Sequence, residues 1–375
     1  MKIKYILCFF ICIAMIFICG CSQDSSHTAI NDSEINDNDS SYDVSSDIII
    51  GNQGNKDKID NNLSVHFIDV GQGDAVFVEL PNRETMLIDA GEKKYSDKVV
   101  KYIENLGYET VSYIVGTHPH SDHIGGLEDV INSFKINSIF MPKISTNTKT
   151  FESLLLTIKN KGLKITTAKK DVKIIDKKDL TATILSPIEE KYSNLNNYSV
   201  VIMLEYKSRK FMFTGDAEEE VENALKGYIS CDVLKVGHHG SSSSTSNDFL
   251  KKLSPKYAVI SCGKGNIYGH PHKETLEKLN KIGAEYMTTE NCGNIVIVTD
   301  GNKLDIRNER ADVMDYSEYA NKENIFMLNI STLKIHYPEC KAVSRMSEDN
   351  KKKSTDNVLS LEEQGYTRCG ICKPE

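Results

Sequence analysis

The chain has 375 residues and lacks three features that would define its architecture or its surroundings. It has no excess of basic residues, since its formal net charge is −8, which argues against strong non-specific binding to nucleic acid. It has no evident internal repeat, which excludes a solenoid or a propeller. It also has no apolar run of about 20 residues, the length that a membrane-spanning helix needs.

The first 21 residues nevertheless indicate export. A basic start with Lys2 and Lys4 precedes a short apolar stretch that closes on Gly20-Cys21. This ending is similar to the cleavage site of bacterial lipoproteins, in which the cysteine receives the lipid. We therefore interpret residues 1–21 as a signal peptide and Cys21 as the lipidated residue, which predicts a lipid anchor on the extracellular face of the cytoplasmic membrane. Secretion after cleavage elsewhere and an uncleaved anchor are the alternatives.

Composition divides the rest of the chain into three parts. Residues 22–62 are rich in Ser, Asp, Asn and Gly. They cannot bury enough apolar surface to offset the entropy of ordering, so a disordered linker is expected. Residues 63–310 have a length typical of one α/β domain, and residues 325–375 are expected to form a small separate module.

Hydrophobic periodicity predicts strands and helices in the main domain. The predicted strands are Val65–Val70, Ala75–Leu80, Thr85–Asp89, Val111–Val115, Ser199–Tyr206, Lys210–Thr214, Val233–Val236, Tyr257–Ser261 and Asn294–Val298. The predicted helices are Asp97–Leu106, Gly126–Phe134, Glu152–Lys161 and Ala217–Lys226. Only turn residues separate the first three strands, which predicts an antiparallel meander there.

Residues able to bind metal follow three of these strands. The first group is Thr117-His118-Pro119-His120-Ser121-Asp122-His123, and the others are Thr214-Gly215-Asp216 and Gly237-His238-His239-Gly240-Ser241. Each alone is a weak signal, because a strand often ends in Asp and a His pair is often solvated. Together they supply the imidazoles and the bridging carboxylate of a two-metal hydrolytic site, with zinc, manganese or iron as suitable ions.

These motifs resemble those of the metallo-β-lactamase fold hydrolases, and above all the extracellular hydrolase domain of the ComEC-type DNA-uptake proteins. The similarity runs over residues 63–307 and includes His66-Phe67-Ile68-Asp69-Val70-Gly71-Gln72-Gly73-Asp74-Ala75, Leu87-Ile88-Asp89-Ala90-Gly91, Asn197-Tyr198-Ser199 and Tyr268-Gly269-His270-Pro271. It implies a four-layer αββα sandwich with two metals at one edge, between the sheets. It does not imply a DNA channel, because the membrane part of ComEC is not in this sequence.

The resemblance also implies roles for individual residues. His118 and His120 would hold metal one, Asp122, His123 and His239 would hold metal two, and Asp216 would bridge the two. We take Asp122, Asp216 and His238 as catalytic: water activated between two Zn or Mn ions would attack an ester, while His238 touches substrate or supports a ligand. The sequence does not decide whether His238 or His239 is the ligand. Asp69 and Asp74 could orient ligand histidines or be ordinary turn carboxylates.

One family ligand is missing. Many metallo-β-lactamase fold enzymes have a further metal-binding histidine before the bridging aspartate, but no histidine occurs from Ile124 to Gly237. Asn197 and Ser199 occupy that region, so metal one is expected to be held more openly, and a β-lactamase is not favoured. Candidate donors to substrate phosphate are Asn197, Ser199, Ser241, Tyr268 and His270. Ser241 could instead belong to a mobile, serine-rich linker.

The C-terminal module contains a second set of ligands. His336-x3-Cys340 and Cys369-x2-Cys372 form two chelating pairs, which predicts one structural zinc in a unit with too little core to fold alone. The segment resembles the metal-binding module of the Ada DNA-repair protein, with His336 in place of its first cysteine, so methyl transfer is not implied. A redox Cys-x-x-Cys or a disulfide with Cys340 is the alternative, and no disulfide is predicted elsewhere.

Two classes of function follow. The first is a lipid-anchored metallohydrolase that acts on phosphodiesters, foremost DNA, with phosphocholine esters or other small phosphodiesters as the alternative substrates. The second is a binding protein whose metal site is structural. The sequence predicts no protein partner, and it does not decide between DNA and RNA, the native metal, the oligomeric state or the role of the C-terminal module.

Overall fold

The computed structural model describes residues 61–310 and 326–374, apart from Lys226, Tyr228, Glu339, Asn357, Ile371 and Lys373. The predicted signal peptide, Cys21 and nearly all of the predicted linker lie outside the described residues. Among the helices of the described part, none is long and apolar enough to cross a membrane.

The first sheet has eight strands in the order β15–β14–β1–β2–β3–β4–β5–β6. Their bounds are β15 Leu304–Asn308, β14 Ile295–Thr299, β1 Leu63–Phe67, β2 Val76–Glu79, β3 Thr85–Ile88, β4 Thr110–Val115, β5 Lys135–Pro142 and β6 Ile165–Ala168. The strands β1, β2 and β3 form the predicted antiparallel meander. From β3 to β6 neighbouring strands are parallel, because α1 (Ser96–Asn105), α3 (Leu127–Ser133) and α4 (Lys149–Asn160) return the chain between them.

The second sheet has seven strands in the order β13–β12–β11–β10–β9–β8–β7. Their bounds are β13 Glu285–Thr288, β12 Tyr257–Ile260, β11 Val233–Lys235, β10 Arg209–Phe213, β9 Val201–Tyr206, β8 Leu180–Ser186 and β7 Lys173–Lys177. The strands from β10 to β13 are parallel. They are connected by α5 (Glu219–Ala224), α6 (Asn247–Leu253) and α7 (Lys273–Lys281).

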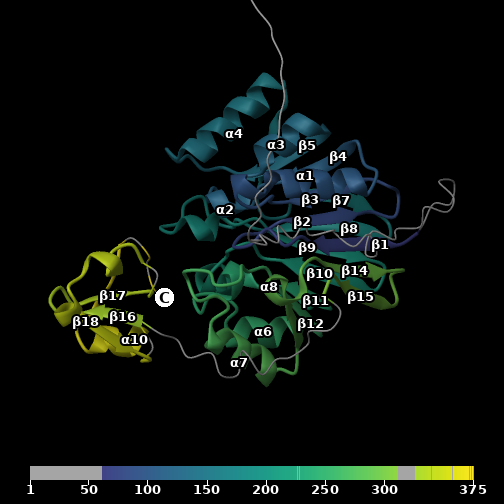
Figure 1. Cartoon of the computed structure of the whole chain (residues 1–375). Helices are drawn as coiled ribbons and strands as arrows, with labels where there is room; N and C mark the ends of the chain where they lie inside the picture. The colour runs from purple at the N-terminus through teal and green to yellow at the C-terminus, as the bar shows by residue number, and fades with distance from the viewer. Residues whose placement is uncertain are drawn as a thin grey trace, which may run out of the picture. The chain divides into compact units, whose positions relative to one another are not determined.

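Three clusters of buried side chains show how the layers pack. One joins the two sheets face to face, through residues such as Phe67 of β1 and Phe213 of β10. A second packs α1, α3 and α4 on the outer face of the first sheet. The third packs α5, α6 and α7 on the outer face of the second sheet, so the domain has four layers, as Figure 1 shows with α4 and α7 on opposite sides of the strands. The predicted αββα sandwich is confirmed.

The two sheets bring their strand ends to the same edge of the sandwich. The chain leaves β3 and β4 of the first sheet, and β10, β11 and β12 of the second, with polar residues that contact one another. The carboxyl ends of parallel strands are where α/β proteins usually bind ligands. The fold thus assembles one candidate site from five strand ends.

The C-terminal module has a four-stranded sheet of its own, in the order β18–β16–β17–β19. Its elements are β16 Phe326–Asn329, β17 Lys334–His336, β18 Lys351–Ser354, α10 Val358–Glu363 and β19 Thr367–Arg368. Its buried cluster is small and includes Phe326, Leu328, Ile335 and Leu361 together with three cysteines. Below about 40–60 residues a hydrophobic core alone is marginal, so this module needs another source of stability.

Candidate metal centre

The loop after β4 carries four of the predicted ligands. It enters the short helix α2 (Ser121–Ile124), which turns Asp122 and His123 toward the inside of the site, while His118 is buried before it. The loop after β1 packs directly against this turn, because the amide of Asp74 donates a hydrogen bond of 3.1 Å to the carbonyl of Asp122. Gly73 has φ +143° and lies so close that a side chain would clash with that carbonyl oxygen, which explains its glycine.

Four predicted ligands form what we call the metal-two group: Asp122, His123, Asp216 and His239. The last three form one cluster of possible ligands with Asp74, with ligand atoms within 4.8 Å of one another, and Oδ2 of Asp122 lies 4.0 Å from Nε2 of His123. The Nε2 atom of His123 lies 3.3 Å from Nε2 of His239 and 3.1 Å from Oδ1 of Asp216. The Nε2 atom of His239 lies 3.3 Å from Oδ2 of Asp122. Ligand atoms on a tetrahedron with bonds of about 2.0–2.1 Å are roughly 3.4 Å apart, so these residues fit one divalent ion.

His118, His120 and Asp216 form the metal-one group. Nε2 of His118 lies 2.9 Å from Nδ1 of His120 and 3.7 Å from Oδ2 of Asp216, and all three ligand atoms lie within 4.8 Å of one another. Asp216 belongs to both groups and is 2% exposed. Its carboxylate therefore lies between the two groups, with Oδ2 near His118 of one group and His239 of the other.

The consecutive residues His238 and His239 lie in a strained turn after β11. Both have left-handed backbones, with φ of 48° and 54°, a conformation that costs energy and recurs at functional sites. The turn directs the Nε2 atoms of both toward Oδ2 of Asp216, at 3.7 Å for His238 and 3.5 Å for His239. His239 is buried, whereas the side chain of His238 is 14% exposed. This arrangement favours His239 as the ligand and leaves the side chain of His238 partly exposed beside it.

Each histidine of the metal-two group has a carboxylate close to its Nδ1 atom, on the side of the ring away from Nε2. Nδ1 of His123 donates to Asp89 at 2.8 Å, and Thr117 holds that carboxylate by its amide and hydroxyl, at 2.8 and 2.6 Å. Nδ1 of His239 donates to the carbonyl of Ser261 at 3.0 Å and lies 3.2 Å from Asp74. Such contacts fix the ring so that Nε2 can bind a metal. Asp74 thus lies where it could orient His239, and its carboxylate also belongs to a cluster of possible ligands with His123, Asp216 and His239.

The charges of the site favour a cation at its centre. Burial opposes a charge on His123 and His239, yet Asp216 with Asp89 or Asp74 raises both pKa values well above the ordinary value. Burial and the neighbouring His123 lower the pKa of His118 well below it. Buried carboxylates that attract positive charge, next to an imidazole held neutral, match a metal site, since metal binding displaces protons from its ligands.

The comparison with protein families decides the classification. The model of the Metallo-beta-lactamase superfamily matches residues 68–264, which include the ligands of both metal groups. The chain belongs to the metallo-beta-lactamase superfamily. The predicted family resemblance and the predicted fold are therefore confirmed.

Two curated relatives match about two thirds of this chain. ComE operon protein 3 of Bacillus subtilis is 34% identical over 251 residues, which cover 62% of this chain and 32% of that protein. Recombination protein 2 of Haemophilus influenzae is 26% identical over 252 residues, which cover 66% of this chain and 30% of that protein. The chain thus spans about a third of the length of these relatives. The solved structure of CmlA, a diiron beta-hydroxylase from Streptomyces venezuelae, is 12% identical, with a TM-score of 0.43 over 62% of this chain and 53% of CmlA, a similarity too low to bear on function.

The residues predicted to contact substrate in this metallo-beta-lactamase domain differ in their exposure to solvent. Four are buried, namely Asn197, Ser199, Ser241 and His270, each at most 2% exposed. Ser199 contacts Nδ1 of His118 at 3.3 Å, and Asn197 donates to Glu220 at 2.7 Å. Tyr268 is 39% exposed, and its ring stacks on that of His270 with centroids 5.6 Å apart. A contact of these two with substrate stays a prediction.

Sequence reasoning missed Lys235, the last residue of β11. Its side chain is 1% exposed, and Nζ lies 2.9 Å from Oδ2 of Asp74 and donates to the carbonyl of Val236 at 2.8 Å. The positive charge helps to lower the pKa of Asp74 against the effect of burial. A lysine inside the apolar run Val233-Leu234-Lys235-Val236 was the available signal, because lysine is almost never fully buried without a partner.

Replacement of Lys235 by methionine should destabilise the domain strongly. Lys235→Met leaves the buried carboxylate of Asp74 without its ion pair, which typically costs about 3–5 kcal/mol of unfolding free energy. Chemical denaturation followed by circular dichroism measures the change. Lys252→Met, at an exposed position of α6, is the control and should change stability by less than about 0.5 kcal/mol. Equal effects of the two substitutions would contradict the structural role of Lys235.

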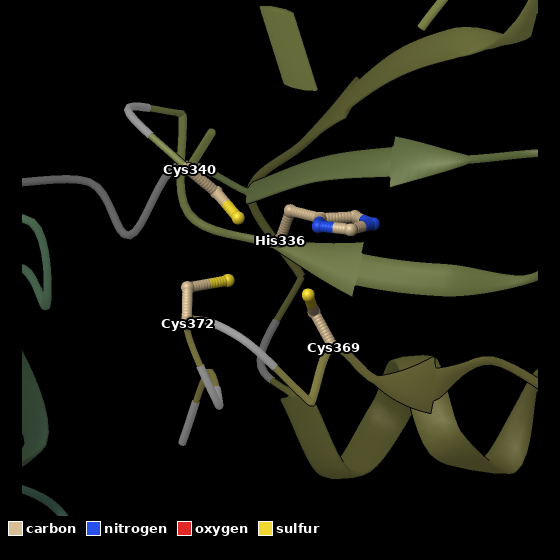
Figure 2. Close-up of side chains that lie close together, drawn as sticks. All are labelled: His336, Cys340, Cys369 and Cys372. Carbon is tan, nitrogen blue, oxygen red and sulfur yellow. The ribbon is translucent and has the colours of Figure 1, made fainter. Parts of the chain in front are cut away.

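The four predicted ligands of the C-terminal module come together in the structure. His336 ends β17, Cys369 follows β19, and their ligand atoms lie within 4.8 Å of one another and of those of Cys340 and Cys372; Figure 2 shows the three thiols close together beside the imidazole. All four are buried, and within the described residues neither ring nitrogen of His336 has a hydrogen-bond partner. Burial raises the pKa of the Cys372 thiol to about 12. Buried imidazole nitrogens without partners among three thiols fit a soft metal ion.

None of the six described cysteines is in a disulfide. Cys231, Cys262 and Cys292 are buried among apolar side chains of the main domain, where they are small hydrophobic residues rather than ligands.

Proposed function

We propose that the protein is a metal-dependent phosphodiesterase that cleaves DNA outside the cell and is held at the membrane surface by a lipid on Cys21. The observation that carries this proposal is the position of Asp216. Its carboxylate lies between the histidines of both metal groups, at 3.1 Å from His123 and 3.7 Å from His118. A shared carboxylate between two donor sets is the arrangement of sites that hydrolyse phosphate esters with two ions.

Different residues would have different roles in such a reaction. Divalent cations, when bound, would activate water and stabilise the negative charge that develops on the phosphate. Asp122, His123 and His239 would hold one cation, His118 and His120 the other, and Asp216 lies where it could contribute to both. The side chain of His238 is 14% exposed, with Nδ1 3.1 Å from the hydroxyl of Ser243 and 3.6 Å from Glu218. Held in this way, its other ring nitrogen can donate a hydrogen bond to a phosphate oxygen or a proton to the leaving group.

The choice of DNA has two supports. One relative is called a recombination protein, and recombination is a process of DNA. The exposed ring of Tyr268 beside His270 offers a surface on which a base could stack.

In the C-terminal module, three thiols and an imidazole favour one structural zinc, which would order that module.

A small phosphodiester is the second candidate substrate. The formal net charge is −8, and three consecutive glutamates, Glu218 to Glu220, follow Asp216 after one alanine. Glu218 contacts His238. Negative charge there disfavours a long polyanion and favours a diester with a cationic group, such as a phosphocholine ester.

Cleavage assays with matched substrates distinguish these functions. The full chain, loaded separately with zinc and manganese, is incubated with labelled single- and double-stranded DNA, with bis-p-nitrophenyl phosphate and with p-nitrophenyl phosphocholine. We expect DNA to be cleaved, and we expect His238→Gln to reduce the rate by about 10²–10⁴-fold, the usual contribution of a proton donor. Turnover of the phosphocholine ester with intact DNA would transfer the assignment to the second candidate. No turnover of any substrate would support a binding protein.

A further inference from the structure

We propose that the main domain rests on an anionic membrane through one side of the sandwich, formed by the second half of α4, by β6 and by the turns next to them. We call this side the basic face and define it by eight exposed residues: Leu155, Leu156, Lys159, Lys161, Lys164, Ile165, Lys169 and Lys170. The folded domain makes this contact, so it is additional to the proposed lipid on Cys21 and does not depend on the reaction at the metal centre.

Positive charge is concentrated in this part of the chain. Residues 143–179 contain ten lysines, four acidic residues and no arginine, which gives a net charge of +6 in a chain whose formal net charge is −8. The rest of the chain is therefore strongly acidic. Lysines close to a membrane with anionic lipids strengthen binding by about fivefold each, so this segment is the part of the domain that such a surface attracts.

The five lysines of the basic face are available to bind an anion. All are exposed, and within the part of the chain that the structure describes none of them forms an ion pair. Lys161 donates to the carbonyl of Asn132 at 3.3 Å, a contact that does not neutralise its charge. Lys173 and Lys177, on β7, are instead paired with carboxylates at 2.8 and 2.5 Å, so we do not include them in the basic face.

Exposed apolar side chains lie among these lysines in the sequence. Leu155 and Leu156 of α4 are 37% and 56% exposed, and Ile165, the first residue of β6, is 38% exposed. They are three of the five large apolar side chains that are exposed in the described part of the main domain. Single exposed apolar residues are normal on soluble proteins, but their concentration in one place marks an interaction surface.

The fold holds both kinds of side chain at one corner of the domain. α4 ends at Asn160, the amide of Leu163 donates to the carbonyl of Ile158 at 3.0 Å, and β6 begins two residues later. This short turn keeps the exposed residues of α4 and β6 on adjoining surfaces. Figure 1 shows α4 on the outside of the domain, and β6 is the last strand of its sheet. The long stems of the lysines can lie along the apolar side chains while their ammonium groups reach an anion.

This combination favours a membrane over a nucleic acid. Surfaces that bind nucleic acid contact its phosphates through basic and polar groups, and exposed leucines add nothing to such contacts. A lipid surface uses both kinds of side chain, because apolar groups enter the headgroup region and lysines bind the anionic lipids. Lysines beside an edge strand also hinder pairing with a second chain, but that role does not account for Leu155 and Leu156 on α4.

Docking through the basic face would hold the metal centre close to the membrane. The first group of predicted ligands follows β4, and β6 lies two strands away in the same sheet. Neighbouring strands are about 4.8 Å apart, so these ligands lie roughly 10 Å from β6 along the sheet. The centre would stay open to solution, and phosphodiesters near the lipid surface would be favoured as substrates.

Binding to vesicles tests the proposal. The full chain with Cys21→Ala is used throughout, so that a lipid on the protein cannot account for binding. It is sedimented with vesicles of phosphatidylcholine alone and with vesicles that also contain anionic phosphatidylglycerol. We expect tighter binding to the anionic vesicles, and we expect high salt to remove this difference because it screens the attraction. Equal binding to both kinds of vesicle at low salt would overturn the proposal.

Matched variants assign the binding to the basic face. Lys159→Gln combined with Lys164→Gln should weaken binding to anionic vesicles by about 30-fold. Lys252→Gln combined with Lys281→Gln removes the same charge from exposed positions of α6 and α7, and it should have almost no effect. Equal losses in the two double variants would show that net charge alone determines binding, which would also overturn the proposal.

The leucines distinguish a membrane from DNA. Leu155→Ser combined with Leu156→Ser should weaken vesicle binding by about tenfold, because less apolar surface enters the lipid. Hydrogen–deuterium exchange should show protection of peptides from α4 and β6 on anionic vesicles. Full binding by the leucine variant, or protection of the same peptides by double-stranded DNA without vesicles, would refute membrane docking. Vesicle binding by a chain that hydrolyses no substrate would contradict only the proposed phosphodiesterase function.

Discussion

Replacement of Asp216 by asparagine is expected to reduce hydrolysis by about 10³-fold or more. Asparagine has nearly the same shape but no charge, and its amide cannot bind two cations at once. Two-metal sites contribute several kcal/mol to charge stabilisation in the transition state, and each 1.36 kcal/mol is a factor of ten in rate. Because Asp216 is the one side chain shared by both metal groups, we expect no other single replacement of a ligand to cost more.

The measurement compares kcat for the best substrate, with folding checked by circular dichroism. Asp176→Asn is a matched control, since this aspartate lies on β7 with 62% of its side chain exposed. It should leave kcat unchanged. Retained hydrolysis in a folded Asp216→Asn protein would rule out a catalytic two-metal centre.

Replacement of Cys372 by serine is expected to unfold the C-terminal module while the main domain stays folded. Structural zinc contributes about 10–16 kcal/mol to the folding of small zinc-dependent units, and the buried cluster of this module is small. The three clusters of the main domain contain no residue of the module. Loss of one ligand should therefore be felt in residues 326–374 and not in the sandwich.

Hydrogen–deuterium exchange with mass spectrometry resolves the two regions. Peptides from β16 and β17 should lose protection in Cys372→Ser and also after treatment of the unaltered chain with a strong chelator. Ser344→Ala, an exposed serine of the same module, should keep full protection. If Cys372→Ser and chelation both left the peptides protected, the zinc assignment would be wrong.

Much of the fold followed from local patterns. The strand prediction Thr85–Asp89 differs from β3 by one residue, and the helix prediction Asp97–Leu106 is shifted by one from α1, because turn residues and apolar periodicity mark these elements. In the main domain the strands β5, β6, β7, β8, β13 and β15 were not predicted. In β5 one half is exposed and the other buried, and in β7 lysines flank only two buried residues, so neither pattern is regular.

In the site, residues close together in the sequence could be predicted, but contacts between residues distant in the sequence could not. His118, His120, Asp122 and His123 could be predicted because four metal ligands in six positions are rarely accidental. Asp89 and Lys235 could not be assigned a role, since their partners His123 and Asp74 are far away in the sequence. Ser199 was predicted to contact substrate; it is buried, and its hydroxyl contacts Nδ1 of His118 at 3.3 Å. Only the packing of the two sheets decides which side of a ligand a residue occupies.

The sequence by itself determined the chemistry of this protein: which imidazoles, carboxylates and thiols are present, and that one family histidine is absent. Those identities predicted a two-metal site and a second, sulfur-rich site. The tertiary structure decided how the possible ligands are distributed, because distance depends on how the sheets meet and not on spacing along the chain. It placed Asp216 among the histidines of both groups and a carboxylate close to Nδ1 of each histidine in the metal-two group.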